Sequence, residues 1–391
     1  MTMAVKNNKV VLGMSGGVDS TASAFLLKKR GFDVHGLYFD VFGDNSTGWE
    51  KAVKAAERLE IPIEYRDVSK EFRQKIISGF YNEYVAGRTP NPCIICNREI
   101  KFEVLCREAD RIGAYYIATG HYAGISHEAE SGGSESGFME EAACEQPQTG
   151  GVPAVTGADR GQEPQNKASF ICRAENAKKD QSYVLWKLDR DTLNRIIFPL
   201  SGFSSKEEIR TLLRAEGFEC AEDKDSQEIC FIENNDYVSF LTEKMGLVPK
   251  EGDFVDEGGN IVGRHGGIIR YTVGQRKGLG VTFGRPVFVT GIDAAANRVF
   301  LGSNEDLFKT RVVSDMNNFH IGSAEEFKGK VLTGKVRYGA PIAECRIDSV
   351  QGSLVTTVFK EAQRAVTPGQ SIVWYDGDRL VGGGIIVRGE K

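Results

Sequence analysis

The sequence lacks any apolar run approaching the roughly 18 residues that a membrane-spanning helix needs, although 41% of its 391 residues are hydrophobic. We therefore expect no membrane span. Its opening residues also lack the apolar core of a secretory signal peptide. These two absences predict a cytoplasmic protein, in which most of the eight cysteines stay reduced.

An excess of basic residues is also missing, because the formal net charge is −5 at pH 7. This average argues against a nucleic-acid partner, but the charge is unevenly distributed. Residues 128–166 carry eight acidic residues and one basic residue, and removing their net −7 from the total leaves +2. A local basic surface elsewhere in the chain is therefore compatible with the composition.

The length of the chain exceeds what one ordinary hydrophobic core supports, so we expect two or three domains. Charged residues make up 26% of the sequence, which is typical of a globular protein.

The most informative stretch spans residues 10–20. It begins as an apolar, β-branched run, turns at Ser15-Gly16-Gly17, and continues as a helical pattern that ends before Gly31. A strand, a glycine turn and a helix start form an anion site, because backbone N–H groups and the helix dipole face the ligand. Ser15 and Ser20 add hydroxyl donors, and Asp19 could hold a Mg²⁺ ion that bridges phosphates.

This stretch lacks the Lys of the Walker A motif. It resembles instead the PP-loop of ATP pyrophosphatases, which cleave ATP between the α- and β-phosphates; the matching letters are SGGVDS. A plain turn between a strand and a helix is the simpler alternative. Six residues in this order, at this place, favour a nucleotide site.

Strands and helices alternate in the N-terminal half. The expected strands are residues 34–40, 61–68 and 115–122, and the expected helices are 47–59, 69–85 with Ser69 as N-cap, and 98–112, with a loop at 88–97. This alternation predicts a doubly wound, Rossmann-like parallel sheet with ligands at the carboxyl ends of its strands.

Residues 126–167 interrupt this pattern, and their composition predicts a disordered acidic insertion. Further elements are then expected: a strand at 169–173, a short helix opening at 179–183, a capped helix at 203–217, and β runs at 267–273 and 331–338. Regular turn spacing in the last third indicates a β-barrel. We thus predict an α/β-plus-β chain with an ATP-binding catalytic domain (1–204), a small central linking domain (205–270) and a C-terminal barrel (271–391).

Two of the cysteines, Cys93 and Cys96, form a CxxC pair in a Pro-rich loop. A zinc half-site is the alternative, but no second CxxC or His pair accompanies it. A following helix N-terminus favours a thiolate, so Cys96 is a candidate nucleophile. Cys230 precedes Phe231-Ile232 and, taken alone, is typical of a buried apolar residue. Of the remaining cysteines, we expect Cys106, Cys172, Cys220 and Cys345 to have structural roles. The last one, Cys144, lies in the insertion.

Over nearly its whole length outside the insertion, the chain resembles the MnmA family of tRNA-specific 2-thiouridylases. The matching stretches are GMSGGVDS, TPNPCIICNREIKF, ATGHYA, KKDQSYVL, KDSQEICFI, TVGQRKGLG, VRYGAP and the TPGQS…GGGII ending. Their order and spacing carry the resemblance.

The resemblance implies an adenine nucleotide alpha hydrolase fold and an ATP-dependent tRNA-uridine 2-sulfurtransferase. ATP and Mg²⁺ would adenylate the C2 oxygen of the wobble uridine, position 34, and release pyrophosphate. Persulfide sulfur would then displace AMP and leave 2-thiouridine. The implied partners are tRNA and a persulfide donor, either a cysteine desulfurase or a sulfur-relay protein.

By position in the motifs, the resemblance implies that Cys96 is the nucleophile and Cys230 the persulfide carrier, and that the two form a transient disulfide. It implies ATP contacts at Gly13, Met14, Ser15, Gly16, Gly17, Val18, Asp19, Ser20, Leu37 and Gly120. It implies a target-base loop at Asn91, Pro92 and Cys93. It implies tRNA contacts at His121, Lys179, Asp180, Gln181, Arg337, Tyr338 and Gln370.

One position departs from the family pattern, since its best-known members have Asp where this chain has Cys93. A thiol orients or deprotonates a base less well than a carboxylate. Three cysteines, Cys93, Cys96 and Cys230, could then hold a 4Fe–4S cluster with one open position. For RNA, the candidate basic residues are Arg270, Arg276, Lys277, Lys335 and Arg337, and ordinary solvated charge is the alternative.

Two other functions stay open. The first is another PP-loop enzyme, such as an amidotransferase-type synthetase or a tRNA lysidine synthetase, which would stay active without Cys96. The second is a non-catalytic RNA-binding module, against which the intact SGGVDS argues. A test of tRNA-dependent pyrophosphate release separates this module from the enzymes.

Overall fold

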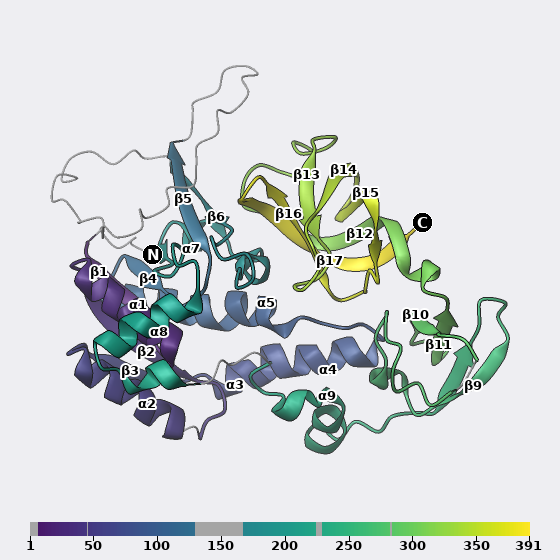
Figure 1. Cartoon of the computed structure of the whole chain (residues 1–391), viewed down its shortest axis with the longest axis horizontal. Coiled ribbons are helices and arrows are strands. Elements are labelled where there is room, and N and C mark those ends of the chain that lie inside the picture. Colours follow the sequence, from purple (N-terminus) through teal and green to yellow (C-terminus); the bar gives the residue numbers. More distant parts are fainter. Residues whose placement is uncertain (1–6, 45, 130–166, 224–228, 282–283) are drawn as a thin grey trace. The chain divides into compact units, whose positions relative to one another are not determined.

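The computed structural model describes residues 7–44, 46–129, 167–223, 229–281 and 284–391 (Figure 1). The chain divides into two compact units. Unit 1 comprises Met1–Arg73, Ile94–Asp225 and Asp378–Leu380, and unit 2 comprises Gln74–Cys93, Ser226–Gly377 and Val381–Lys391. Within the described ranges, the helices are all too short or too polar to cross a membrane.

Unit 1 is built on a five-stranded sheet in the order β3-β2-β1-β4-β7. Neighbouring strands in it pair in parallel: β3 with β2, β2 with β1, β1 with β4, and β4 with β7. The strands are β1 (Lys9–Gly13), β2 (Asp33–Asp40), β3 (Ile63–Asp67), β4 (Tyr116–Ala118) and β7 (Ile196–Ile197). The predicted doubly wound parallel sheet is therefore confirmed, with the apolar β1 run buried between its neighbours.

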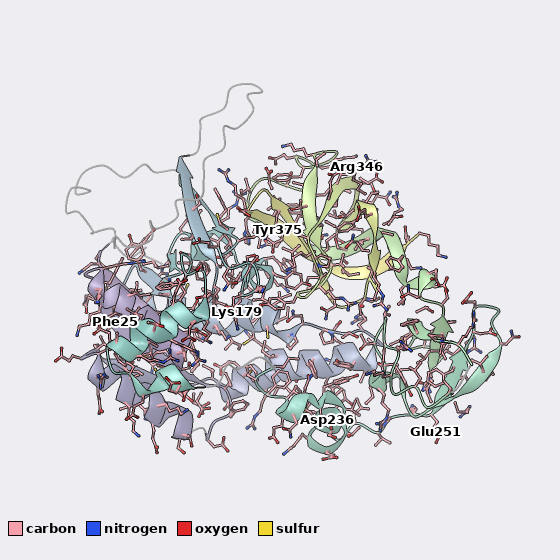
Figure 2. All side chains as sticks on the ribbon, viewed as in Figure 1. Phe25, Lys179, Asp236, Glu251, Arg346 and Tyr375 are labelled. Carbon is pink, nitrogen blue, oxygen red and sulfur yellow. The ribbon has the colours of Figure 1, made fainter. Side chains whose placement is uncertain are left out.

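Unit 1 also contains the helices α1 (Val18–Lys29), α2 (Ser46–Arg58), α3 (Ser69–Phe72), α7 (Arg190–Leu193) and α8 (Lys206–Ala215). Of these, α1 and α2 pack directly on strands of the sheet, and α8 packs on α1. Phe25 of α1 packs edge-on against Phe218 at 6.2 Å, and both lie in the core shared by α1, α8 and the sheet (Figure 2). The predicted helix at 203–217 is confirmed: Ser205 caps α8 by accepting from the Glu208 N–H, and Gly217 follows its end with φ +73°.

The predicted helix at 69–85 is confirmed in its extent, since helical residues run without a break from Ser69 to Val85, but its predicted N-cap is wrong. Ser69 is the first helical residue rather than the N-cap, and the Asp67 carboxylate accepts from its N–H at 2.9 Å. Hydrogen bonds from the Ser69 hydroxyl and N–H lower the pKa of Asp67. A π segment, η1 (Arg73–Ile77), separates α3 from α4 (Ser78–Val85).

The segment at 88–97 was expected to be a loop, but helical structure begins at Pro92. Helix α5 (Pro92–Cys96), the π segment η2 (Asn97–Lys101) and α6 (Phe102–Ile112) follow one another without a break. Proline is favoured at the first helical position because its missing N–H would have no intrahelical partner there. The proline that indicated a loop therefore starts the helix.

The insertion is narrower than predicted. Strands β5 (Gly124–Ala129) and β6 (Lys167–Cys172) form an antiparallel pair that ends at Ala129 opposite Lys167. Residues 126–129 and 167 are thus strand residues, while 130–166, with Cys144, lie outside the described residues. The helix expected to open at 179 is a 3₁₀ turn, η3, at Ser182–Leu185.

Unit 2 contains a four-stranded sheet in the order β10-β11-β8-β9. Its strands are β8 (Gly252–Val255), β9 (Ile261–His265), β10 (Phe288–Asp293) and β11 (Arg298–Gly302). The strand expected at 267–273 is wrong, because Ile268–Arg270 form a 3₁₀ turn after Gly267, whose φ is +116°. A short helix, α9 (Tyr237–Ser239), and the π segment η6 (Phe240–Lys244) precede this sheet.

Six strands at the end of the chain close into a barrel through the pairing of β12 with β17. They are β12 (Phe308–Phe319), β13 (Leu332–Lys335), β14 (Ala343–Gln351), β15 (Leu354–Arg364), β16 (Ser371–Asp376) and β17 (Arg379–Glu390). Trp374 and Tyr375 are fully buried in β16, and Tyr375 is labelled in Figure 2. The predicted fold class is therefore confirmed, while the three domain boundaries stay predictions.

Candidate nucleotide site and catalytic cysteines

The loop between β1 and α1 is held in a conformation that requires glycine. Gly16 has φ +76°, and a Cβ there would lie 2.5 Å from the backbone N of Ala52. Gly120, which follows β4, also lies close to other backbone atoms. A Cβ at Gly120 would lie 3.0 Å from the carbonyl carbon of Asp19. These close approaches pack the loop after β1 against α2, and the residue after β4 against the start of α1.

Two serine hydroxyls hold the same loop. Ser20 Oγ accepts from the Ser15 N–H at 3.2 Å, lies 3.2 Å from Ser15 Oγ, and donates to the Gly17 carbonyl at 3.2 Å. Gly17 caps α1 without a side-chain hydrogen bond to the first turn. These hydrogen bonds hold the loop together, and the N-terminus of α1 suits an anion.

A cavity of about 250 Å³ opens beside this loop within unit 1. Its lining residues come from the carboxyl ends of β1, β2 and β4, from the start of α1, from η2 and from the segment before η3: Gly13, Met14, Ser15, Asp19, Ser20, Tyr38, Phe39, Lys101, Thr119, Gly120, His121 and Gln181. This is the edge where a parallel α/β sheet binds its ligands.

Six of the predicted ATP residues lie on the cavity wall, namely Gly13, Met14, Ser15, Asp19, Ser20 and Gly120. Leu37 is buried and its carbonyl accepts from the Met14 N–H at 2.9 Å. Sequence reasoning missed Tyr38, Phe39, Lys101 and Thr119 as lining residues. Contact between the lining residues and ATP stays a prediction.

The Asp19 carboxylate is engaged on both oxygens. Oδ1 accepts from the Tyr122 hydroxyl at 2.8 Å, and Oδ2 lies 2.9 Å from Lys206 Nζ. Sequence reasoning missed Lys206, which lies 187 positions from Asp19. Because Asp19 is the one carboxylate among the lining residues, a Mg²⁺ ion there would take further ligands from phosphates and would compete with Lys206.

His121 is held in its neutral form. Its Nδ1 lies 2.8 Å from Thr119 Oγ1, and its ring stacks on Phe102 at 6.0 Å and meets Phe198 edge-on at 6.3 Å. Burial, and then the positive charge of Lys101, lower the pKa of His121 to about 3. A tRNA contact by this side chain would therefore be a neutral hydrogen bond or a stacking contact, not an ion pair.

The predicted tRNA contacts at 179–181 also serve the fold. The buried Asp180 carboxylate accepts from the N–H groups of Ala174 and Ser182, each at 3.1 Å, and from the Ser182 hydroxyl at 2.9 Å. The Gln181 side chain accepts from the Tyr122 N–H at 2.9 Å and lines the cavity. These bonds hold the segment beside the phosphate loop, and its role toward tRNA stays a prediction.

The cysteines of the CxxC pair lie on α5. Cys93 is exposed, and its N–H donates to Asn91 Oδ1 at 3.2 Å, whereas Cys96 is 6% exposed. Since the helix begins at Pro92, the helix N-terminus acts mainly on Cys93 and only weakly on Cys96. The expectation that a helix start directly after the CxxC pair activates Cys96 is therefore corrected.

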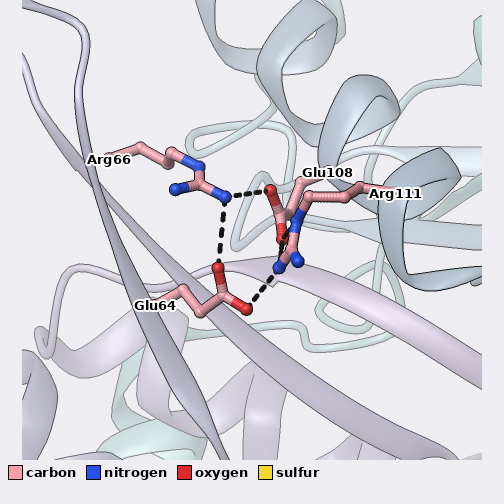
Figure 3. Close-up of polar contacts among 4 residues, drawn as sticks. All are labelled: Glu64, Arg66, Glu108 and Arg111. Carbon is pink, nitrogen blue, oxygen red and sulfur yellow. Dashed lines mark hydrogen bonds and ion pairs between the residues drawn. The ribbon is translucent and has the colours of Figure 1, made fainter.

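The helical run from Pro92 is fixed at two points. The buried Asn97 side chain donates to the Val184 carbonyl at 3.0 Å. Further along, Figure 3 shows Glu108 of α6 between Arg66 and Arg111, with Glu64 of β3 contacting both arginines. Burial alone would raise the pKa of Glu108, but hydrogen bonds from Arg111 and Arg66 outweigh it and keep the pKa low. This network ties the helix to the sheet.

Cys230, in unit 2, is exposed rather than buried, unlike the expectation for this residue taken alone. The following Phe231 is buried; its ring packs edge-on against Phe80 at 5.2 Å and at a tilt against Phe240 at 5.2 Å. The apolar residues after Cys230 thus anchor the segment, while Cys230 itself is at the surface.

Other cysteines have the environment of structural residues. Burial raises the pKa of Cys106 to about 11, and burial and then the charge of Glu344 raise that of Cys345 to about 12. Burial also raises the pKa of Cys220. These thiols stay protonated at neutral pH and are poor nucleophiles.

The predicted tRNA contacts in the barrel differ in exposure. Tyr338 is 41% exposed, and Lys335 Nζ lies 5.8 Å above its ring. Arg337 donates to the Ala365 carbonyl and, at 3.1 Å, to Thr367 Oγ1. Gln370 Nε2 donates to the Thr89 carbonyl at 2.9 Å, so it fixes the chain just before Asn91 within unit 2.

No group of three or more His, Cys, Asp or Glu side chains is placed to hold a metal ion in the part of the chain that the structure describes. The 4Fe–4S cluster on Cys93, Cys96 and Cys230 therefore gains no support here and stays a prediction.

Comparisons with known proteins agree with this architecture. Family profiles match three consecutive segments: a "tRNA methyl transferase HUP domain" at residues 8–234, a "tRNA methyl transferase PRC-barrel domain" at 239–303 and an "Aminomethyltransferase beta-barrel domain" at 313–386. Among solved structures, the U34-tRNA thiolase NcsA from Methanococcus maripaludis with its 4Fe–4S cluster is 24% identical, covering 30% of this chain and 40% of that chain. Its TM-score of 0.24 is too low to support an inference.

Curated relatives match over nearly the full length. "tRNA-specific 2-thiouridylase MnmA 1" of Clostridium botulinum (strain Okra / Type B1) is 40% identical, covering 96% of this chain and 98% of the relative. "tRNA-specific 2-thiouridylase MnmA" of Clostridioides difficile (strain 630) is 38% identical, covering 97% and 98%. The chain belongs to the MnmA family of tRNA-specific 2-thiouridylases.

Proposed function

We propose that the chain is a tRNA-uridine 2-sulfurtransferase that converts the wobble uridine, position 34, to 2-thiouridine and cleaves ATP to AMP and pyrophosphate. One observation carries the proposal: a cavity walled by the Ser15–Ser20 loop lies in the same compact unit as Cys96. Family membership over nearly the full length supports it.

The first step would be adenylation of the base. The uracil O2 attacks the α-phosphorus of ATP, the bond to the β-phosphate oxygen breaks, and the N3 proton leaves to solvent. The start of α1 and the hydroxyls of Ser15 and Ser20 would bind the departing pyrophosphate. Asp19 would hold Mg²⁺, which supplies further charge neutralisation on the phosphates when it is bound.

The second step would transfer sulfur. A persulfide on Cys230 attacks C2 of the adenylated uridine, AMP leaves, and a disulfide joins the base sulfur to Cys230. The Cys96 thiolate then attacks the Cys230 sulfur, which releases 2-thiouridine and leaves a Cys96–Cys230 disulfide. A cellular thiol reductant must restore both thiols, which suits the cytoplasm.

The tRNA itself would be bound by residues of both units. In unit 2, the exposed Tyr338, together with Lys335, offers a stacking and charged surface for the RNA backbone. Asn91, Pro92 and Cys93 would contact the target base, and a cysteine desulfurase or relay protein would load Cys230.

Cys93 has two candidate roles in the sulfur chemistry, and they predict different experimental results. If Cys93 only orients the base, Cys93→Asp should retain thiolation and contain no iron. If it ligates a cluster with Cys96 and Cys230, the anaerobically purified wild type should contain iron and absorb visible light, and the variant should lose both.

The proposed function is tested by pyrophosphate release from ATP with and without unmodified tRNA. We expect release only with tRNA, and we expect it to survive Cys96→Ser while 2-thiouridine formation stops. Release that ignores tRNA would contradict the proposal. Another PP-loop activity would instead leave Cys96→Ser fully active on its own substrate.

A further inference from the structure

We infer that Lys101 is a catalytic residue that binds the α-phosphate of ATP and of the adenylated uridine; this inference rests on the proposed function and deepens it. Lys101 is the one Lys or Arg among the described residues that line the cavity. It shares that wall with Ser15, Asp19 and Ser20 of the phosphate loop.

The Lys101 ammonium group has no hydrogen bond or ion pair with any residue in the described ranges. The obvious partner in the cavity, the Asp19 carboxylate, is engaged by Tyr122 and Lys206. A half-buried cation without a counter-charge is costly, and a bound anion would relieve that cost. The cavity is thus built to receive negative charge at this point.

The backbone of Lys101 is also held in place. It is the last residue of the π segment η2, and the residues on either side, Ile100 and Phe102, are each 1% exposed. π segments are frequent at functional sites, and one π turn joins residues five apart. Lys101 therefore lies about one turn beyond Cys96 on the same helical run, which would bring a phosphate ligand and the nucleophile to one base.

The chemistry assigns Lys101 to the α-phosphate rather than to the pyrophosphate. The loop at Ser15–Ser20 and the start of α1 suit the two phosphates that leave together. When the O2–phosphorus bond forms and pyrophosphate departs, negative charge stays on the non-bridging α-oxygens. A fixed cation that remains with these oxygens stabilises both the adenylation transition state and the later departure of AMP.

Binding measurements with a nucleotide, AMP, and its nucleoside, adenosine, test this contact without tRNA. Lys101→Met keeps the aliphatic stem and removes the charge, Lys101→Arg keeps the charge, and Lys54→Met on the exposed face of α2 is the matched control. By calorimetry, Lys101→Met should weaken AMP binding about 10- to 100-fold, as loss of a charged hydrogen bond does, and leave adenosine binding unchanged. Lys101→Arg and Lys54→Met should bind AMP nearly as the wild type does.

Kinetics give the second measurement. In single turnover, tRNA-dependent pyrophosphate release should fall about 100-fold in Lys101→Met and recover in part in Lys101→Arg. Equal losses for AMP and adenosine, or no loss for either, would overturn the inference. Absence of tRNA-dependent release in the wild type would instead refute the proposed function, and the comparison of AMP with adenosine would still decide the role of Lys101.

Discussion

The Asp19 carboxylate lies between two donors, the Tyr122 hydroxyl at 2.8 Å from Oδ1 and Lys206 Nζ at 2.9 Å from Oδ2. The side chain of Lys206 is only 15% exposed, so the pair is shielded from solvent on one side. Asp19 thus has a second role besides the proposed metal contact, which is to hold Tyr122 and Lys206 at the phosphate loop.

Asp19→Ala should abolish tRNA-dependent pyrophosphate release while the chain still folds. Because Tyr122 and Lys206 lose their acceptor, the free energy of unfolding should also fall by about 1–3 kcal/mol. Chemical denaturation and the pyrophosphate assay measure the two effects separately. Lys206→Met is the control that keeps the carboxylate: it should retain Mg²⁺-dependent activity, whereas unchanged ATP turnover in Asp19→Ala would contradict the assignment of the loop.

His121 should stay neutral across the physiological range. Its pKa of about 3 in the folded chain lies below the ordinary value of 6.5, so between these values the unfolded chain binds a proton that the folded chain does not. Its contribution therefore makes the fold less stable as pH falls below about 6.5. In His121→Gln this acid sensitivity should shrink. The direct measurement is the His121 ring proton by NMR, and an inflection between about pH 5 and pH 8 would refute the account.

The turn that ends in Gln370 should control the target-base loop within unit 2. Gly369 has φ +89°, and a Cβ there would lie 3.0 Å from Arg88 Cβ and from the Thr89 backbone N. Gly369→Ala should therefore shift the chain before Asn91 and reduce 2-thiouridine formation about 10-fold or more, with ATP binding retained. Gly377→Ala is matched, because Gly377 also has positive φ, +57°, but nothing lies within 4 Å of its Cβ position. Equal effects of the two changes would show that backbone strain alone is responsible.

Residues 130–166 should be dispensable, because their composition offers little apolar surface to bury. Strands β5 and β6 pair up to Ala129 opposite Lys167, so an Asn–Gly turn between these two residues should close the hairpin. The thermal midpoint and thiolation of this shortened chain should match those of the full chain. Insoluble expression of the shortened chain would show that the segment packs against the fold.

Structural features that depend on residues close together in the sequence were predicted correctly from local sequence patterns. The apolar run of β1, the glycine turn and the capped helix at 203–217 each depend on neighbouring residues, and all were correctly predicted. Lys206 was missed because its partner Asp19 is distant in the sequence. Pro92 was misinterpreted because proline is compatible with both a loop and the first turn of a helix. At 267–273 the apolar pattern was that of a strand, but Gly267 directs the chain into a 3₁₀ turn.

Adenylation and sulfur transfer are separate steps of the proposed reaction, and Cys96 and Cys230 act only in sulfur transfer. Cys96→Ser and Cys230→Ser should each form adenylated tRNA and then stall. Wild type that turns over without reductant should yield a crosslinked peptide that contains both residues, which lie in different compact units.

The most direct test of the central claim is mass spectrometry of nucleosides from unmodified tRNA after incubation with the purified chain, ATP and a persulfide donor. The account predicts 2-thiouridine at position 34 with wild type and none with Cys230→Ser, although that variant still releases pyrophosphate. Full thiolation by Cys230→Ser would contradict the persulfide relay, and no thiolation by the loaded wild type would contradict the proposed function.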